Sequence, residues 1–294
     1  MLTIDYQLEL KNITSFLQKT VKSCGYHKVI LALSGGIDST VAFYLCLKAL
    51  GKNNAYVMIS PYDDYDKTGH QLIDHLININ NIDADHIFRF NIKKVVNQIN
   101  NDTTTVSFWR PRQTSGESGI SYYQKGNIMA RVRMTYLYSL ANKHHFLVCG
   151  TENKSEYLLG YFTRFGDEAS DFEPIRHLYK TQVIELAKYL NIPKEIIIKQ
   201  PTAGLWHGQT DEQELGFSYA DADQILQLYF NNIKNISIGN MPTVVPNYNR
   251  DEGAYRDEKQ VLLKIYKKFD KKIVNAVISR VNQNKFKHLT PYHL

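Results

Sequence analysis

The chain reads Lys28-Val29-Ile30-Leu31-Ala32-Leu33-Ser34-Gly35-Gly36-Ile37-Asp38-Ser39 near its N-terminal end. The apolar run from Val29 to Leu33 predicts a buried strand. The two glycines let the backbone turn sharply after this strand, and a helix is expected from Thr40 to Leu50, where Gly51 stops it. A second apolar run, Ala55 to Ile59, predicts the next strand. Together these segments form a βαβ unit.

The same alternation of apolar runs and helical patterns continues along the chain. Further helices are expected at about residues 67–79, 122–143, 181–190, 219–230 and 258–282, and further strands at about residues 86–91 and 146–150. Strands separated by helices indicate an α/β fold with a doubly wound, mostly parallel sheet and flanking helices. Such sheets hold ligands at the carboxyl ends of their strands. Functional residues are therefore expected just after Leu33, Ile59, Asn91 and Gly150.

Length and composition predict one domain. The chain has 294 residues, of which 43% are hydrophobic, so it can bury a full core, and we expect a single domain over residues 1–294. Two stretches, near residues 100–120 and 233–257, are rich in polar residues and glycine and are interpreted as insertion-like loops. The N-terminal sequence lacks the pattern of a signal peptide, and no apolar run is long enough to cross a membrane.

The cysteines and the net charge narrow the class of protein. Cys24, Cys46 and Cys149 lie far apart in the sequence, so neither a zinc ribbon nor a disulfide framework is indicated, and a cytoplasmic location is expected. The net charge of +6 suits an anionic partner, which could be a nucleic acid or a nucleotide. Composition does not choose between these partners, so the choice depends on the motifs.

The segment Ser34-Gly35-Gly36-Ile37-Asp38-Ser39 has the features of a phosphate-binding loop. The start of the following helix offers unpaired N–H groups to an anion, and Ser34 and Ser39 add hydroxyl donors. A carboxylate at Asp38 would repel phosphate unless a divalent cation lay between them, so Asp38 is predicted to bind magnesium. The lysine of the G-x-x-x-x-G-K-[ST] loop is missing. The alternative to a phosphate-binding role is an ordinary turn from a strand into a helix that is capped by Ser or Asp.

This loop resembles that of the ATP pyrophosphatases, the PP-loop superfamily, which grip the β- and γ-phosphates while the α-phosphate is attacked. The superfamily includes NAD synthetase, GMP synthetase, asparagine synthetase and tRNA-thiolating enzymes. The loop therefore implies the ATP chemistry and leaves the acceptor open.

Motifs in the second half of the chain resemble the NAD synthetase family. Gly126 to Met134 reads G-N-I-M-A-R-V-R-M, which is similar to the G-N-x-x-A-R-x-R-M segment of that family. The further matches follow in family order, at Gly150 to Glu156, Gly160 to Asp167, Asp171, Leu178 to Thr181, Pro201 to Trp206 and Gly208 to Glu212. The chain is therefore identified as a member of the ammonia-dependent NAD synthetases, which implies a fold like that of the adenine nucleotide alpha hydrolases.

The resemblance implies roles for individual residues. It implies ATP contacts at Ser34, Gly35, Gly36, Asp38, Ser39, Thr151, Lys180 and Thr202, magnesium ligands at Asp38 and Glu156, and acid-substrate contacts at Arg131, Arg164, Asp171 and Lys287. Asp38 and Lys180 are the implied catalytic residues. Glu156 also follows the strand that ends at Gly150, so it reaches the same sheet edge as Asp38. Without Asp38, a glutamate there would be read as a partner of the helix dipole.

The sequence departs from the family pattern at several positions. Arg164 stands where a lysine is usual, and Phe286 replaces the histidine that normally precedes Lys287. The loop that begins at Ser60 lacks the usual arginine, so no adenine contacts are assigned to it. Arg131 and Arg133 project to nearly opposite sides of a helix, so only one can face the site. The resemblance selects Arg131 and leaves Arg133 on the surface or at an interface.

The reaction that the resemblance implies has two steps. A carboxylate oxygen of deamido-NAD attacks the α-phosphate of ATP and expels pyrophosphate, and ammonia then displaces AMP from the acyl adenylate. Mg²⁺ is the implied cofactor and a homodimer the implied assembly, with neither nucleic acid nor membrane as a partner. A glutaminase domain would need a few hundred further residues, so free ammonia is the expected donor.

Three alternatives stay open at this point. Amidation of nicotinate mononucleotide differs from the implied reaction only in the acid. Sulfur transfer to tRNA would suit the basic charge, but it would need a pair of sulfur-handling cysteines. The third alternative is a nucleotide-binding regulator that has lost catalysis, which the altered Arg164 and Phe286 positions favour and the intact Asp38, Glu156 and Lys180 oppose.

Overall fold

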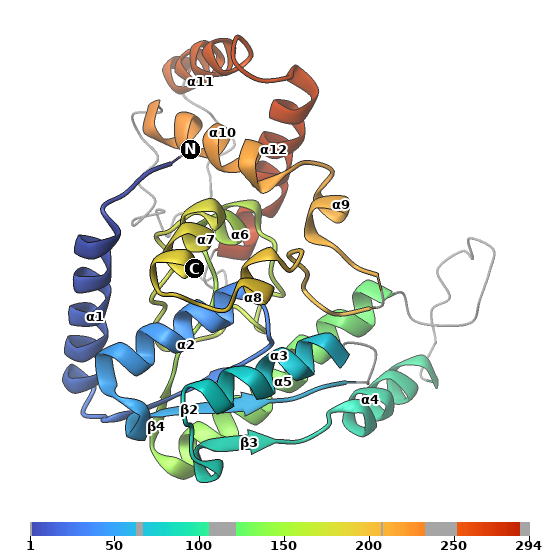
Figure 1. Cartoon of the computed structure of the whole chain (residues 1–294). Helices are drawn as coiled ribbons and strands as arrows, with labels where there is room; N and C mark the ends of the chain where they lie inside the picture. The colour runs from blue at the N-terminus through green and yellow to red at the C-terminus, as the bar shows by residue number, and fades with distance from the viewer. Residues whose placement is uncertain (1, 63–66, 106–121, 207, 233–251, 289–294) are drawn as a thin grey trace.

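The computed structural model describes residues 2–62, 67–105, 122–206, 208–232 and 252–288 (Figure 1). Its centre is a sheet of four parallel strands in the order β3-β2-β1-β4. The strands are β1 (Lys28–Ala32), β2 (Ala55–Ile59), β3 (Ile87–Arg89) and β4 (Phe146–Val148). The expected doubly wound parallel sheet is confirmed. Because β2 and β4 lie on opposite sides of β1, the crevice beyond β1 and β4 is the topological switch point, where such folds bind ligands.

Helices cover both faces of the sheet because its side chains alternate between two cores. Val29 and Leu31 of β1 belong to a large core with α1 (Tyr6–Ser23), α2 (Ile37–Leu50), α3 (Lys67–Ile79), α7 (Lys180–Tyr189) and α8 (Lys194–Ile198). Ile30 belongs to a smaller core that includes Leu137 of α5 (Tyr122–His144), and α4 (Lys93–Thr105) packs beside α5. We call the sheet and these helices the sheet layer.

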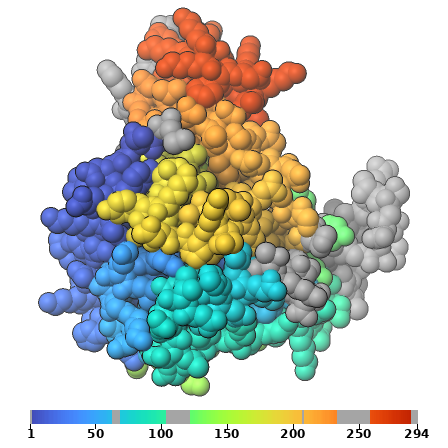
Figure 2. Space-filling model, in the orientation of Figure 1, coloured from blue at the N-terminus to red at the C-terminus, as the bar shows by residue number. Residues whose placement is uncertain are grey.

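A second group of helices extends from the middle of Figure 1 to its top. It contains α6 (Lys154–Leu159), α10 (Tyr219–Asn232), α11 (Glu252–Ile265) and α12 (Lys271–Asn284), and the short α9 (Asp211–Leu215) precedes it. These helices share a hydrophobic core around the fully buried Tyr229, Val274 and Val277. We call this group the helical layer. Figure 2 shows residues 175–205, which include α7 and α8 of the sheet layer, in yellow between the blue and cyan part of that layer below and the helices α10 to α12 above.

The single helix expected over residues 258–282 is wrong. The chain forms α11 and α12 there, and they are separated by a break before Asp270. The Asp270 carboxylate accepts hydrogen bonds from the backbone N–H groups of Lys272 and Ile273, so it caps a new helix start.

The two stretches that were interpreted as loops are partly helical. Residues 100–105 continue α4 and residues 252–257 begin α11, while 106–121 and 233–251 lie outside the described residues. No helix among the described residues is both long and apolar enough to cross a membrane.

Two of the cysteines meet in the core although they are 103 positions apart in the sequence. The Sγ atoms of Cys46 on α2 and Cys149 after β4 lie 3.7 Å apart, and both residues are buried. This contact packs α2 against the end of the sheet.

Candidate active site

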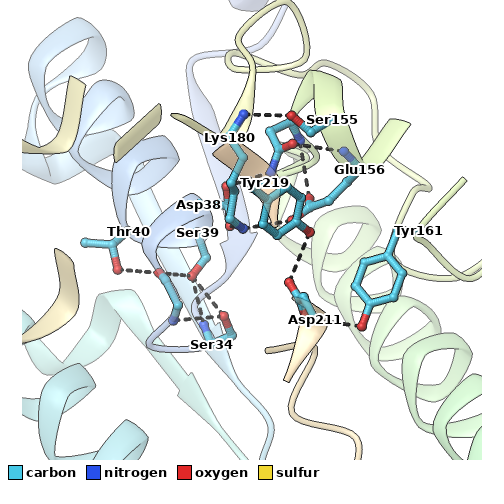
Figure 3. A network of polar contacts seen from close by, with 12 residues as sticks. Ser34, Asp38, Ser39, Thr40, Ser155, Glu156, Tyr161, Lys180, Asp211 and Tyr219 are labelled. Carbon is cyan, nitrogen blue, oxygen red and sulfur yellow. Dashed lines mark hydrogen bonds and ion pairs between the residues drawn. The ribbon is translucent and has the colours of Figure 1, made fainter. Parts of the chain in front are cut away.

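The predicted phosphate loop, residues 34–39, turns from β1 into α2, and hydrogen bonds of its serine hydroxyls stabilise the turn (Figure 3). We call these residues the phosphate loop. The Ser34 and Ser39 hydroxyls lie 3.0 Å apart, and the Ser39 hydroxyl lies 3.1 Å from the Gly36 carbonyl oxygen. The Gly36 N–H donates to the Ser34 hydroxyl at 3.3 Å. No side chain caps α2, so the first N–H groups of this helix stay available for an anion.

The backbone conformation and the packing of the loop require a glycine at position 35. Its φ is +74°, and a Cβ at this position would lie 2.9 Å from the carbonyl oxygen of Gly69 at the start of α3. Only glycine combines this backbone conformation with such a close approach. Gly35 is not among the residues that line the cavity described below, whereas Ser34, Gly36, Asp38 and Ser39 are.

Asp38, Glu156 and Lys180 come together at the switch point of the sheet. Lys180 Nζ lies 2.5 Å from Asp38 Oδ2 and 2.9 Å from Glu156 Oε1 (Figure 3). Asp38 lies in the first turn of α2, Glu156 in the first turn of α6, and Lys180 is the first residue of α7. Three segments that are distant in the sequence therefore supply one charged cluster.

Local contacts fix Lys180 at the start of α7. The backbone N–H of Lys180 donates to the Ser155 hydroxyl, and the N–H of Thr181 donates to the buried carboxylate of Asp223. Ser155 in turn donates to Asp223. The helix start is thus held by groups from α6 and α10, and the Lys180 side chain is 3% exposed.

The electrostatics of the cluster favour an ammonium ion between two carboxylates. Burial alone would lower the pKa of Lys180, but Asp38 and Glu156 outweigh it and hold this pKa above its ordinary value. Burial raises the pKa of the Glu156 carboxyl, and the charge of Lys180 opposes this effect. Carboxylate oxygens are the ligands that Mg²⁺ prefers. One cation, the Lys180 ammonium, already contacts the carboxylates of both Asp38 and Glu156. Asp38 and Glu156 therefore fit a shared divalent ion.

Asn153 is a member of this cluster that the sequence reasoning missed. It is fully buried, its Nδ2 donates to Asp38 Oδ1 at 2.9 Å, and its Oδ1 accepts from the Glu156 N–H at 3.0 Å. Asn153 caps α6 in a capping box with Glu156. The sequence signal was available, because an Asn three residues before a Glu is typical of a helix start.

Asp211 is a third carboxylate beside the cluster, it is more deeply buried than Asp38 and Glu156, and it was also missed. The hydroxyls of Tyr161 and Tyr219 each lie 3.1 Å from it, and the Tyr161 hydroxyl lies 3.0 Å from Glu214 (Figure 3). Burial holds the pKa of Asp211 above its ordinary value, and the charge of Lys180 offsets only part of this effect. The Asp211 N–H donates to the Pro201 carbonyl at 3.0 Å, so this hydrogen bond joins the backbone at residues 201 and 211.

A cavity of about 280 Å³ extends from this cluster along the sheet edge. Thr151, Lys180 and Thr202 line it together with the phosphate loop, as expected for a nucleotide site. Arg133, which was expected on the surface or at an interface, also lines it. The Arg133 Nε donates to the Ser60 carbonyl oxygen, because this side of α5 faces the loop after β2.

The four residues assigned to the acid substrate are not among those that line this cavity. Arg131 is exposed and donates to the carbonyl of Arg164, and the Arg164 guanidinium lies 4.7 Å from the Phe165 ring. Lys287 donates to the carbonyls of Gly160 and Phe162. Arg131 and Lys287 thus both donate to carbonyl groups of the segment from Gly160 to Phe165, which includes Arg164.

Asp171 is held in a different way. Its carboxylate accepts from the Val148 N–H at 2.7 Å and lies 3.4 Å from the Tyr138 hydroxyl, whose pKa is raised to about 12 by burial and by this carboxylate. In the structure Asp171 joins the end of β4 to α5.

Comparisons with known proteins find similar sequences and structures over most of the chain. The model of the NAD synthase family matches residues 9–246. The NH(3)-dependent NAD(+) synthetase of Fusobacterium nucleatum is 33% identical over 279 residues, covering 95% of this chain and 92% of that protein. The enzyme of the same name from Thermococcus kodakarensis is 42% identical over 227 residues, covering 77% and 82%.

Two solved structures resemble the chain along almost its whole length. The NMN synthetase from Francisella tularensis has a TM-score of 0.73 and 28% sequence identity, with 99% of each chain covered. The NH3-dependent NAD synthetase from Campylobacter jejuni has a TM-score of 0.71 and 27% identity, with 99% of this chain and 100% of that chain covered. The family model matches residues 9–246, and the Fusobacterium nucleatum relative matches 95% of the chain. The chain therefore belongs to the NAD synthase family.

Proposed function

We propose that this protein amidates the nicotinate carboxylate of deamido-NAD with ammonia, converting ATP to AMP and pyrophosphate. The observation that carries the proposal is the cluster of Asp38, Glu156 and Lys180 beside the phosphate loop, in a chain whose relatives are NH(3)-dependent NAD(+) synthetases. The proposal includes Asp38 and Glu156 as holders of Mg²⁺, a homodimeric assembly, and free ammonia as the nitrogen donor.

In the first step the phosphate loop and Lys180 bind the β- and γ-phosphates, and the acid attacks the α-phosphate in line with the departing pyrophosphate. The N–H groups at the start of α2 and the hydroxyls of Ser34 and Ser39 orient the phosphates. Lys180 stabilises the charge that develops on the leaving group. Mg²⁺, when bound, would neutralise phosphate charge. Thr151 and Thr202, which line the same cavity, are the further ATP contacts in this proposal.

In the second step ammonia attacks the carbonyl carbon of the acyl adenylate and AMP leaves. No protein nucleophile is needed, because the adenylate already activates the carbonyl group. Arg131, Arg164, Asp171 and Lys287 hold the acid substrate in this proposal. Residues 201–205 and Asp211 line the cavity and would exclude the water that could hydrolyse the adenylate.

The direct test uses deamido-NAD labelled with ¹⁸O in its carboxylate, together with ATP, Mg²⁺ and ammonium. NAD, AMP and pyrophosphate should form in equal amounts, and one labelled oxygen should appear in AMP. Glutamine in place of ammonium should give no NAD. ADP as the product, or AMP without the label, would contradict the acyl adenylate.

A second candidate substrate is nicotinate mononucleotide, which would yield the mononucleotide amide by the same two steps. The likeness to the NMN synthetase of Francisella tularensis over 99% of both chains favours it, as do the departures at Arg164 and Phe286. The comparison of kcat/KM for the two acids decides between them. A higher value for nicotinate mononucleotide would replace the acid in the proposal and keep the reaction.

A further inference from the structure

One fully buried side chain, Asn153, contacts the elements that carry both magnesium-binding carboxylates of the proposal. Its Nδ2 donates to Asp38 Oδ1 on α2, and its Oδ1 accepts from the N–H of Glu156 on α6. The Asn153 backbone N–H also lies 3.4 Å from Glu156 Oε2. The Lys180 ammonium contacts both side chains, Asp38 Oδ2 at 2.5 Å and Glu156 Oε1 at 2.9 Å.

Chemistry determines which way the Asn153 amide points. The backbone N–H of Glu156 can only donate, so the amide oxygen must face it. An ionised Asp38 carboxylate can only accept, so the NH₂ group must face Asp38. Leucine or alanine at this position would satisfy neither group, and an acidic residue would place a carboxylate against Asp38.

The Asn153 contact also holds the Asp38 carboxylate in one orientation. The Asn153 amide donates to Oδ1, and in this orientation Oδ2 lies beside Lys180 Nζ. A carboxylate that is held at one oxygen loses little further freedom when it binds an ion at the other.

We propose that Asn153 is a positioning residue that orients Asp38 and Glu156 as one cation-binding pair. The inference rests on the proposed function only in taking a divalent cation with ATP as the ligand. Asn153 itself would touch neither the cation nor the nucleotide.

Two variants separate this role from helix capping. Serine and threonine cap helices about as well as asparagine, since their hydroxyl accepts from the same N–H group. Their hydroxyl ends one bond short of the amide nitrogen and cannot reach both Asp38 and the Glu156 N–H. Asn153→Ser and Asn153→Thr therefore keep the cap and remove the contact with Asp38.

The experiment measures Mn²⁺ binding by electron paramagnetic resonance, in the presence of a non-hydrolysable ATP analogue and without the acid substrate. Both variants should unfold within a few degrees of the wild-type chain and bind Mn²⁺ about 10- to 100-fold more weakly. The matched control is Asp5→Ser, which changes the cap of α1 far from the site and should leave Mn²⁺ affinity unchanged.

The possible outcomes are distinguishable. Wild-type Mn²⁺ affinity in a folded Asn153→Ser or Asn153→Thr variant would overturn the inference and leave the proposed function standing. A wild-type chain that binds no Mn²⁺ with the analogue would overturn the proposed ATP chemistry as well. Failure of deamido-NAD as a substrate affects neither measurement, because no acid is present.

Discussion

Lys180 lies between two carboxylates, so its removal should affect stability and catalysis by different routes. Lys180→Gln keeps a polar side chain that is one bond shorter, and it leaves Asp38 and Glu156 without the cation between them. We expect turnover to fall by about 10²- to 10³-fold and the free energy of unfolding to fall by about 3 kcal/mol. Added Mg²⁺ should restore more stability to the variant than to the wild type.

The measurement is thermal unfolding with and without Mg²⁺, alongside an assay of pyrophosphate release. Lys188→Gln is the matched control, because Lys188 lies on the same helix and pairs with Glu185 at an exposed position. It should change neither quantity appreciably. If Mg²⁺ stabilised the Lys180→Gln variant no more than the wild type, Asp38 and Glu156 would not share a cation.

His288 provides a pH-dependent term in stability. Burial and the charges of Arg176 and Lys287 lower the pKa of His288 to about 4, and its ring packs against Tyr157 and Phe162. In the unfolded chain the pKa returns to about 6.5. The unfolded state therefore binds more protons than the folded state between pH 6.5 and 4, and stability should fall as the pH falls through this range.

His288→Asn removes this term, so the comparison of the two chains isolates it. The wild type should lose about 1 to 3 kcal/mol more than the variant between pH 7 and pH 4, as measured by urea unfolding at each pH. The buried carboxyls of Glu152 and Glu173 have raised pKa values and contribute to both chains equally. Parallel pH profiles would show that His288 titrates normally in the folded protein.

At the scale of elements, the contact between α6 and α12 depends on one glycine. Gly160 ends α6 with a φ of +61°, and a Cβ there would lie 2.3 Å from Cβ of Asn284 on α12. Gly160→Ala should lower the free energy of unfolding by about 2 to 4 kcal/mol, from backbone strain and from the displacement of α12.

Gly25→Ala is the control for the strain alone. Gly25 has a φ of +77°, but its added Cβ would meet nothing within 4 Å, so about 1 kcal/mol is expected. Urea unfolding of both variants gives the difference that belongs to the packing of α6 on α12. Equal losses would mean that α12 moves aside freely.

The elements of the sheet layer could be predicted from the sequence, but their partners in the helical layer only in part. Apolar runs and glycines give local signals, so the ranges predicted for β2 and α3 agree with the structure. The break between α11 and α12 was missed because the apolar spacing continues across it and only Asp270 marks it. The short helices α6, α8 and α9 carry too few residues to show a period.

The same division applies to the candidate site. The sheet edge paired Asp38 with Glu156, the resemblance to the NAD synthetase motifs added Lys180, and the structure places Lys180 in contact with both carboxylates. The spacing of Asn153 before Glu156 signals a helix cap, but the contacts of Asn153 with Asp38 and of Asp211 with Tyr161 join residues that are distant in the sequence, which spacing does not reveal. Helical geometry separates Arg131 from Arg133 without saying which one faces inward; the resemblance selected Arg131 as the acid contact, and Arg133 is the one that lines the cavity.

At the scale of the whole molecule, the charged cluster joins two separately packed cores. Asp38 belongs to α2, whose Val41 and Leu45 lie in the core of the sheet layer. Glu156 belongs to α6, whose Leu158 and Leu159 lie in the core of the helical layer. A ligand held by both carboxylates therefore requires the two layers to keep one relative position.

This junction has a consequence for hydrogen exchange. A nucleotide and cation bound at the cluster should act as a cross-link between the layers, so the protection of backbone amides should rise in α12 as well as in α2. At a ligand concentration of about 100 times Kd, amides that exchange through opening of the whole protein should slow about 100-fold. Mass spectrometry of deuterium uptake can follow both helices in one experiment. Slowing confined to α2 would mean that the helical layer opens independently of the bound nucleotide, and that α12, which supplies no residue to the cluster, gains nothing from its occupation.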